Sequence, residues 1–304
     1  MNYIIGIDGG GTKTVGLLGD SDGTIHARVE SGPSNYHVVG EVQTQKVLAD
    51  LISRLLAQAN ATLADCTGAC LGMAGLARPA DQRIIDRLCD EICLTPNRML
   101  TNDAQIALAG GAGKCEGVVI IAGTGSIVYG LNSQGREERA GGWGHLLGDE
   151  GSGYDIAWRG LRAVARAADG RGTPTQVTNL ILNELGLKQP SDLIPWIHAA
   201  SKDQVAQLAG QVFAAVDTGG RVARQIIEDA ADELTIAAKV VIDRLHFDRP
   251  FDVVLSGGIF EHQPGFVAVL RERLEAVAPA AQIGLPKHEP AYGALLLAKS
   301  QFDA

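Results

Sequence analysis

Short apolar segments rich in β-branched residues alternate with helical patterns along most of this chain. The predicted strands lie at Tyr3–Ile7, Thr14–Leu18, Ile25–Val29, Gly68–Met73, Arg98–Leu100, Val118–Ile121 and Val253–Leu255. Apolar residues recur at intervals of three and four over Val42–Ala57, Ala80–Cys93, Val222–Arg244 and Gly265–Ala276, which predicts helices. This alternation predicts an α/β chain with a largely parallel sheet. Tight turns join the first three strands and predict an antiparallel part, so the sheet should be mixed.

A weak internal repeat predicts two related halves. The apolar segment YIIGI leads into DGGGTKT, and about 115 residues later GVVIIAG leads into GTGSIVYG. Each time a buried strand ends in glycines and hydroxyl residues before another strand begins. We expect an N-terminal half at residues 1–112 and a C-terminal half at 113–289, facing each other across a cleft. The terminal helix 290–304 should pack back onto the first half, and the polar segment at about 171–217 reads as a helical insertion.

Composition and charge exclude several classes of protein. The chain has 304 residues, 46% of them hydrophobic, which is enough for a large buried core. Its formal net charge is −9 and no lysine- or arginine-rich run interrupts the acidic excess, so we expect no nucleic-acid partner and no anionic membrane partner. The apolar runs are far shorter than a membrane span, and no basic segment leads into an apolar one at the N-terminus. The predicted location is the cytoplasm.

Four of the five cysteines form two pairs with C-x3-C spacing, which raises the alternative of a metal or iron–sulfur site. Cys70 lies in a predicted buried strand, whereas Cys89 and Cys93 lie in the predicted helix Ala80–Cys93 and would extend its apolar face. Metal sites more often use C-x2-C pairs in turns. We therefore predict that these cysteines, with Cys66, pack in the core as reduced thiols.

The two glycine-rich turns have the chemistry of a phosphate site. Glycine permits conformations in which consecutive amides point inward at an anion. The first turn offers the amides of Gly10, Gly11 and Thr12, the hydroxyls of Thr12 and Thr14, and the charge of Lys13. The second turn offers Gly123, Thr124, Gly125 and Ser126. Asp8 beside a polyphosphate would be repulsive without a cation, which predicts Mg²⁺ held directly or through water. The alternative is that these glycines only permit hairpins, and neither turn completes a GxxxxGK[ST] or GxGxxG motif.

Four motifs identify a family resemblance that covers nearly the whole chain. GIDGGGTKT, AGTGS and LSGGIF resemble the phosphate and adenosine motifs of the sugar kinase, heat-shock ATPase and actin superfamily. GGWGHLLGDEGSGYDIAWRGL at Gly141–Leu161 resembles the signature of the N-acetylglucosamine kinase branch of the BadF/BadG/BcrA/BcrD-type ATPase family. The resemblance implies two actin-like, ribonuclease H-like halves, each with a mixed five-stranded sheet flanked by helices, and an ATP cleft between them. It also implies a homodimer.

The resemblance assigns roles to individual residues. Asp103 in LTNDAQIAL looks like the catalytic base, although an aspartate there is also typical of a helix cap. Gly257 and Gly258 would lie against adenine and ribose. The residues implied to bind the sugar are Asn35, Ala74, Gly75, Asp103, Gly142, Trp143 and Asp149. Asn35 has the alternative of an ordinary turn residue and Trp143 that of core packing. Related kinases have a serine before the glycine where this chain has Ala74, so one sugar hydrogen bond is missing or replaced.

The sequence therefore predicts an ATP-dependent kinase that transfers the γ-phosphoryl group of Mg·ATP to the 6-hydroxyl of N-acetylglucosamine. Glucosamine or N-acetylmuramic acid is an alternative acceptor. A second alternative is an ATPase activator of an iron–sulfur dehydratase or reductase, and a third is a sugar sensor without enzymatic activity.

Overall fold

The computed structural model describes residues 2–76 and 78–302 and divides the chain into two compact units. Unit 1 comprises Met1–Val119 with Pro286–Ala304, and unit 2 comprises Ile120–Leu285. Residues 303 and 304 of the predicted terminal helix lie outside the described residues. Within the described ranges, none of the helices combines the length and apolar character that a membrane span requires.

Unit 1 is built on a mixed five-stranded sheet. Its strands are β1 (Tyr3–Gly9), β2 (Thr14–Asp20), β3 (Ile25–Ser31), β4 (Cys66–Met73) and β5 (Arg98–Asn102). They lie in the order β3-β2-β1-β4-β5, with β1, β2 and β3 antiparallel and β1, β4 and β5 parallel. The predicted antiparallel meander and the predicted mixed sheet are both confirmed.

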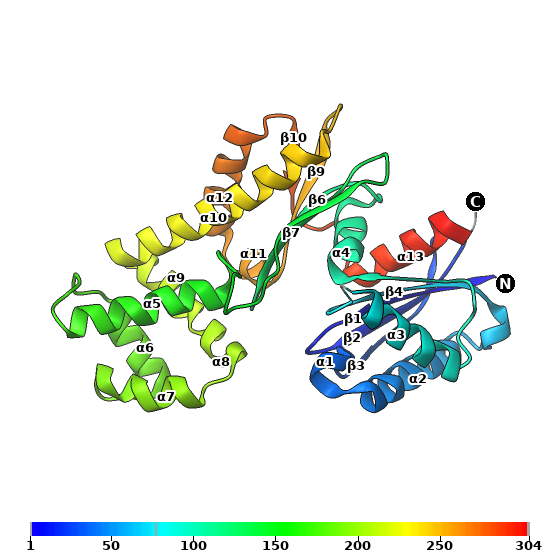
Figure 1. Cartoon of the computed structure of the whole chain (residues 1–304), viewed down its shortest axis with the longest axis horizontal. Helices are drawn as coiled ribbons and strands as arrows, with labels where there is room; N and C mark the ends of the chain where they lie inside the picture. Colours follow the sequence, from blue (N-terminus) through cyan, green and yellow to red (C-terminus); the bar gives the residue numbers. More distant parts are fainter. Residues whose placement is uncertain (1, 77, 303–304) are drawn as a thin grey trace. The chain divides into compact units, whose positions relative to one another are not determined.

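Helices cover both faces of this sheet. They are α1 (Tyr36–Val39), α2 (Glu41–Gln58), the 3₁₀ turn η1 (Leu63–Asp65), α3 (Pro79–Glu91), α4 (Asp103–Ala112) and α13 (Pro290–Phe302). Figure 1 shows α2 and α3 on one face, and α4 with α13 on the other. One apolar cluster lies under each pair of helices. The helices α4 and α13 cross so closely that a Cβ on Gly293 would stand 1.9 Å from the carbonyl oxygen of Ile106, so only glycine fits at this crossing.

Unit 2 repeats the strand order of unit 1. The strands are β6 (Gly117–Ala122), whose first residues belong to unit 1, β7 (Ser126–Leu131), β8 (Glu137–Gly141), β9 (Phe251–Ser256) and β10 (Ala281–Gly284). Their order is β10-β9-β6-β7-β8, with β7 and β8 antiparallel and β9 and β10 parallel. In each sheet the first strand of the set is central, flanked by the second and the fourth. The two glycine turns therefore occupy equivalent places, because one joins β1 to β2 and the other joins β6 to β7.

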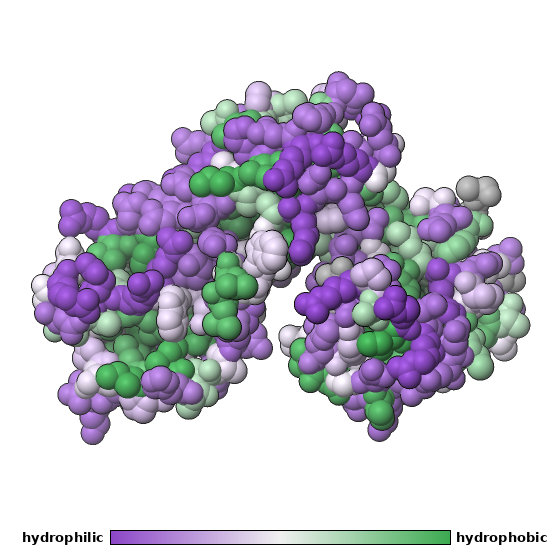
Figure 2. All heavy atoms as spheres, viewed as in Figure 1, coloured by the Kyte–Doolittle hydropathy of each residue, from purple (hydrophilic) through white to green (hydrophobic). Residues whose placement is uncertain are grey.

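The helices of unit 2 are mostly grouped between β8 and β9. They are α5 (Gly153–Ala168), α6 (Val177–Leu185), the 3₁₀ turn η2 (Pro190–Asp192), α7 (Leu193–Ala199), α8 (Lys202–Gln207), α9 (Ala209–Asp217), α10 (Arg221–Leu245), α11 (Gly258–His262) and α12 (Pro264–Val277). The segment predicted as an insertion at 171–217 contains α6 to α9. Figure 1 shows α5 and α10 side by side, and Figure 2 shows hydrophobic residues as separate patches among hydrophilic ones on the visible face of this unit.

The cysteines follow the predicted core role with one exception. Cys66, Cys70 and Cys89 are buried, and burial raises the pKa of the Cys70 thiol to about 12. The prediction for Cys93 is wrong, because α3 ends at Glu91 and Cys93 is exposed in the following turn with φ +57°. Among the described residues no group of three or more His, Cys, Asp or Glu side chains is placed to hold a metal ion.

Candidate active site

The first glycine turn, Gly10–Lys13, leaves three consecutive amides available. The Gly10 amide donates to the carbonyl of Lys13 at 2.9 Å and closes the turn. The amides of Gly11, Thr12 and Lys13 make no hydrogen bond within residues 2–76 and 78–302. A Cβ on Gly11 would meet no atom within 4 Å, so this side of the turn is open. Three free amides beside open space form a site that can accept the oxygens of a phosphate group.

Thr14 does not share this role. Its side chain is fully buried, and its hydroxyl donates to the carbonyl of Gly32 at 2.8 Å and lies 2.8 Å from the Ser34 hydroxyl. The predicted contribution of Thr14 to phosphate binding is therefore wrong, because this hydroxyl holds β2 to the segment after β3. Thr12 remains exposed in the turn.

The parallel register brings the first turn and the predicted base to one edge of the sheet in unit 1. The last residues of β1, β4 and β5 lie in one row across the sheet: Gly9, Met73 and Asn102. The chain therefore leaves all three strands at the same edge, as Gly10, Ala74 and Asp103. The Ala74 amide fixes this edge further by donating to the Gly9 carbonyl at 2.8 Å.

Asp103 is the first residue of α4 rather than its cap. The cap is Asn102, whose side-chain oxygen accepts the Gln105 amide at 2.8 Å. The Asp103 carboxylate accepts backbone hydrogen bonds from the Ala104 amide, at 3.1 Å, and from its own amide. Its second oxygen makes no hydrogen bond to another described side chain, which leaves it available to a bound alcohol.

Asp8 and Asp103 form an electrostatically unfavourable pair. Burial, together with the negative charge of Asp103, raises the pKa of Asp8 to about 7. The charge of Lys13 lowers this pKa, and the charge of Glu289 raises it. Burial also raises the pKa of Asp103. The sequence analysis did not identify Glu289, the residue before α13. Arg28 of β3 donates hydrogen bonds of 2.9 Å to its carboxylate.

This concentration of acids suits a divalent cation. Oxygen ligands are those that Mg²⁺ prefers, and a cation would relieve the repulsion between Asp8 and Asp103. Since the described residues contain no group able to chelate a metal alone, most ligands would come from phosphate oxygens and water. Asp8 fits this arrangement as a single protein carboxylate.

Asn35 is fixed to the first turn. The Gly10 carbonyl accepts the amides of Ser34 at 3.1 Å and Asn35 at 3.2 Å, and the Asn35 side-chain oxygen accepts the His37 amide at 3.1 Å. The Asn35 side-chain nitrogen makes no hydrogen bond in the described part of the chain. Gly75 lies beside this loop with φ +86°, and a Cβ there would stand 2.9 Å from the His37 ring. The structure therefore brings Asn35 and Gly75 together.

Asp81 supports the Asn35 loop, which sequence analysis did not predict. Its buried carboxylate accepts a hydrogen bond from Tyr36, accepts the Arg78 amide at 3.0 Å and lies 3.5 Å from His37. The bond from Tyr36 lowers the pKa of Asp81, and burial raises the pKa of Tyr36 to about 12. No local pattern signals this network, because its members are about 45 residues apart in sequence.

The second glycine turn, in unit 2, is more extensively bonded. The Gly123 amide donates to the Gly125 carbonyl at 2.9 Å, and the Ser126 hydroxyl donates to the Glu150 carbonyl at 2.7 Å. Among the residues that the structure describes, the amides of Thr124 and Gly125 have no hydrogen-bond partner. These two amides are the part of the turn that remains available to an anion.

Asp149 holds the second turn in place. It is 3% exposed and has φ +65°, a left-handed conformation that is unfavourable outside glycine. One carboxylate oxygen accepts the Ser126 amide at 3.4 Å and the other accepts Lys202 Nζ at 2.8 Å. A Cβ on Gly125 would stand 2.9 Å from this carboxylate. Lys202, from α8, is a functional candidate that no nearby motif indicated.

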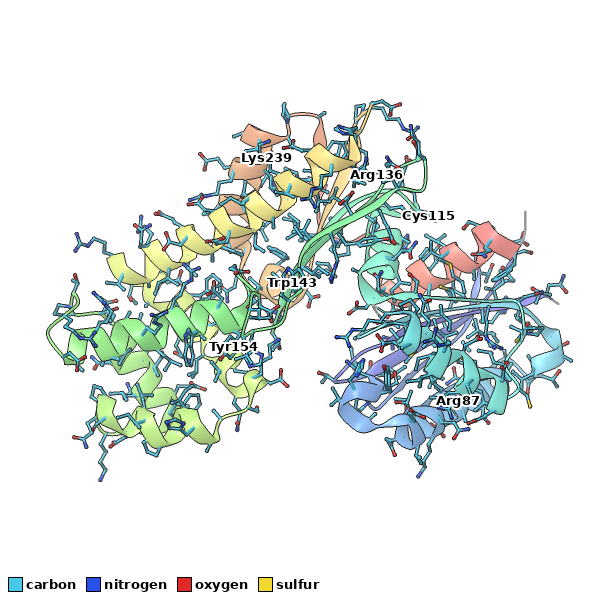
Figure 3. The ribbon with its side chains drawn as sticks, in the orientation of Figure 1. Arg87, Cys115, Arg136, Trp143, Tyr154 and Lys239 are labelled. Atoms are coloured by element: carbon cyan, nitrogen blue, oxygen red, sulfur yellow. The ribbon has the colours of Figure 1, made fainter. Side chains whose placement is uncertain are left out.

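The loop between β8 and α5 exposes apolar side chains. Trp143 is 66% exposed with the Arg139 guanidinium 5.6 Å from its ring, and Leu146 and Leu147 are more exposed still. Core packing of Trp143 is therefore excluded. Figure 3 places Trp143 on this loop and Tyr154 at the beginning of α5. Gly142, with φ +70°, donates its amide to the Ser126 carbonyl at 3.1 Å and joins the loop to the second turn.

The two glycines of LSGGIF have different surroundings. Gly257 has φ +110°, and a Cβ there would stand 2.5 Å from the Ala122 carbonyl oxygen at the end of β6. Gly258 begins α11, and a Cβ on it would meet nothing within 4 Å. Gly257 is thus required by packing within unit 2, whereas Gly258 borders open space that a ligand can use.

We predict that Lys202→Met destabilises the protein and weakens nucleotide binding. The substitution leaves the buried Asp149 carboxylate without its cation, which should lower the free energy of unfolding by about 2–3 kcal/mol. Urea unfolding and an ATP titration measure both effects. Lys239→Met is the matched control, because it breaks an exposed ion pair with Asp243 on α10 and should change little. Equal losses in the two variants would contradict the role given to Lys202.

The chain is similar over its whole length to known amino-sugar kinases. The chain is 37% identical over 306 residues to the N-acetylmuramic acid/N-acetylglucosamine kinase of Clostridium acetobutylicum, covering 100% of both chains. It is also 37% identical to the N-acetyl-D-glucosamine kinase of Dictyostelium discoideum, covering 97% of both. The solved structure of a candidate N-acetylglucosamine kinase from Chromobacterium violaceum matches with a TM-score of 0.77 and 27% identity, covering 98% of this chain and 99% of that one.

The family-level comparison spans almost the same length. The model of the BadF/BadG/BcrA/BcrD ATPase family matches residues 5–298, a range that contains both glycine turns, Asp103 and the Gly141–Leu161 signature. The chain belongs to the BadF/BadG/BcrA/BcrD ATPase family.

Proposed function

We propose that this protein is an ATP-dependent N-acetylglucosamine kinase that phosphorylates the 6-hydroxyl of its sugar. The observation that carries the proposal is the convergence, at one sheet edge of unit 1, of three free turn amides, the paired carboxyls Asp8 and Asp103, and the Asn35 loop. The relatives at 37% identity, which are named for N-acetylglucosamine phosphorylation, support the same activity.

Asp103 acts as the general base. A sugar hydroxyl is a weak nucleophile, and a carboxylate within hydrogen-bond reach can orient it and accept its proton as the bond to phosphorus forms. The free oxygen of Asp103 provides this acceptor, and the raised pKa makes it a stronger base than an exposed aspartate. The Ala104 amide keeps the other oxygen, and hence the carboxyl plane, in place.

The two turns bind the phosphates of ATP. The amides of Gly11, Thr12 and Lys13 in unit 1 and those of Thr124 and Gly125 in unit 2 supply neutral donors, and Lys13 supplies charge. Mg²⁺, bound with the nucleotide, would neutralise phosphate charge, and Asp8 would hold it through water. Gly10, Gly123 and Ser126 keep the turns in shape, because their own amides already have acceptors. Gly258 offers the open surface for the nucleoside, beside Gly257.

Each unit contains residues that we propose for sugar binding. In unit 1 the Asn35 side-chain nitrogen is available to a sugar oxygen, with Ala74 and Gly75 beside it. In unit 2 Gly142 and the exposed Trp143 offer an apolar surface to a ring face or an acetyl methyl. Asp149 is proposed to bind sugar hydroxyls through the acceptor sites that Ser126 and Lys202 leave on its two carboxylate oxygens. Asp103 contributes through the reacting hydroxyl.

The experiment is a substrate panel. Purified protein with Mg·ATP is assayed for ADP release with N-acetylglucosamine, glucosamine, N-acetylmuramic acid and glucose, and the product is located by ³¹P and ¹³C NMR. We expect the highest kcat/KM for an N-acetylated sugar and phosphate on C6. ADP release that is independent of every sugar would refute the proposal. Sugar binding without phosphorylation would instead indicate a sensor.

N-acetylmuramic acid is a second candidate acceptor, favoured by a hollow of about 210 Å³ in unit 2. Lys202 lines this hollow with His145, His198 and the stacked rings of Tyr154 and Trp158, whose centroids are 5.9 Å apart. Groups of this kind suit an acidic substituent on a sugar. The panel decides between the acceptors by the ratio of the two kcat/KM values.

The iron–sulfur activator alternative is not favoured by the cysteine environment. Cys66, Cys70 and Cys89 are buried in β4 and α3, and among the described residues no group of metal-binding side chains is present. Protein purified in air should be colourless. The homodimer, the cytoplasmic location and the absence of nucleic-acid partners stay predictions from the sequence.

A further inference from the structure

A second hollow in unit 2 has no place in the proposed reaction. It is an open hollow of about 520 Å³ on the surface between the second half of α5 and the first turns of α10. Four arginines line it: Arg159, Arg162 and Arg166 of α5, and Arg221 of α10. Arg159 joins the two helices, because its guanidinium lies 3.6 Å from Asp229 of α10.

The charges in this hollow are not balanced by the protein. Arg159 forms ion pairs with Asp155 at 2.9 Å and with Asp229. Asp229 is the acid among the lining residues, and it is therefore already paired. Arg162 and Arg221 make no hydrogen bond or ion pair with any described residue, and Arg166 donates only to the Arg171 carbonyl at 3.3 Å. Three guanidiniums thus share a hollow whose one lining carboxylate, Asp229, is paired with Arg159, in a chain whose net charge is −9.

The start of α10 adds an independent observation. Helix N-termini carry a partial positive charge and favour acids, yet the first turn of this 25-residue helix contains no acid and begins with Arg221. Its cap, Gly220, has no side chain to accept the free amides. Arginine at this position is unfavourable for the helix, whereas a bound anion would satisfy both the guanidinium and the amides.

We infer that this hollow is a binding site for a small molecule that carries phosphate groups. Guanidinium pairs with phosphate through two parallel hydrogen bonds, and three unpaired guanidiniums exceed the charge of one phosphate monoester. The volume is that of a small-molecule site. Val222 and Ile226 line the same hollow and supply apolar surface for the rest of the ligand.

Inorganic pyrophosphate is the probe that tests this site. It is titrated into the full-length protein by calorimetry in about 50 mM salt, with a non-hydrolysable ATP analogue and Mg²⁺ present to occupy the glycine turns. We expect wild-type protein to bind with Kd below about 1 mM. The double variant Arg162→Gln/Arg221→Gln should bind at least tenfold more weakly, and each single variant should lie between the two.

The matched control is Arg83→Gln/Arg224→Gln. It removes the same two charges from exposed arginines that do not line the hollow, and Arg224 lies in the same first turn of α10. This variant should bind the probe like wild type. No binding by wild-type protein, or an equal loss in both double variants, overturns the inference. Because the readout is binding and not turnover, its result is independent of the proposed kinase activity.

Discussion

Asp103→Asn should lower kcat about 1,000-fold while the affinities for Mg·ATP and sugar change less than about threefold. A positioned general base typically contributes 10²- to 10⁴-fold to the rate. Asparagine keeps the shape of the side chain and can still accept the Ala104 amide, but it cannot take the proton of the sugar hydroxyl. Steady-state kinetics and a separate nucleotide titration measure the two parts of this prediction.

The control for Asp103 is Asp22→Asn. Asp22 is an exposed acid in the turn between β2 and β3, so its replacement makes the same change of charge in unit 1 away from the sheet edge. It should leave kcat unchanged. Turnover at the wild-type rate in Asp103→Asn would remove Asp103 from the reaction and with it the proposed mechanism.

Asp8→Asn should raise the stability of the protein above pH 7 and weaken its use of Mg²⁺ in turnover. Its pKa of about 7 in the folded protein lies above the ordinary value of 3.8, so the folded state binds more protons than the unfolded state between these pH values. The stability contributed by this group therefore falls as pH rises from about 4 to 7. Above pH 7 Asp8 is ionised in both states, and the loss in the free energy of unfolding is complete. Asparagine removes that loss, which is about 1–4 kcal/mol.

Thermal unfolding across pH tests this prediction in the absence of nucleotide. Asp8→Asn should melt several degrees above wild type at pH 8, and the difference should vanish near pH 4. The same variant should require more Mg²⁺ for half-maximal turnover, because the carboxylate proposed to hold the metal's water is lost. A melting difference that does not change with pH, or an unchanged Mg²⁺ requirement, would contradict the placement of Asp8.

Most strands and most of the long helices could be predicted because their signals are local, whereas β8 and β10 were not predicted. The apolar residues of each strand and helix recur with the period of that element within a single segment. The glycine-rich sequences DGGGTKT and AGTGS mark turns at the ends of β1 and β6, as the structure shows. Prediction failed where a side chain's surroundings come from distant parts of the chain. Thr14 is an example, because it is buried against Gly32 and Ser34. The failure at Cys93 has a local cause, because α3 ends at Glu91 and Cys93 follows it in a left-handed conformation.

The residues of the candidate site also fall into those that a motif indicated and those that only the folded structure identified. The motifs pointed to Asp8, Asn35, Asp103 and Asp149 by residue type and position. Asp81, Glu289 and Lys202 carry no motif of their own, and each reaches the site through contacts 45 or more residues away in sequence. Only the folded chain shows that Asp149 holds the second turn through Ser126 and is itself held by Lys202.

The amino-acid sequence alone determined the two segments in which a strand leads into a glycine turn, because each depends on residues that are neighbours along the chain. It predicted Asp103 as the reactive carboxyl through the motif LTNDAQIAL. Tertiary structure decided the strand order, which amides remain free, that the charge of Asp103 raises the pKa of Asp8, and where three arginines gather without a paired carboxylate. These properties depend on distances between residues that are far apart in sequence, and burial and Coulomb energy follow those distances.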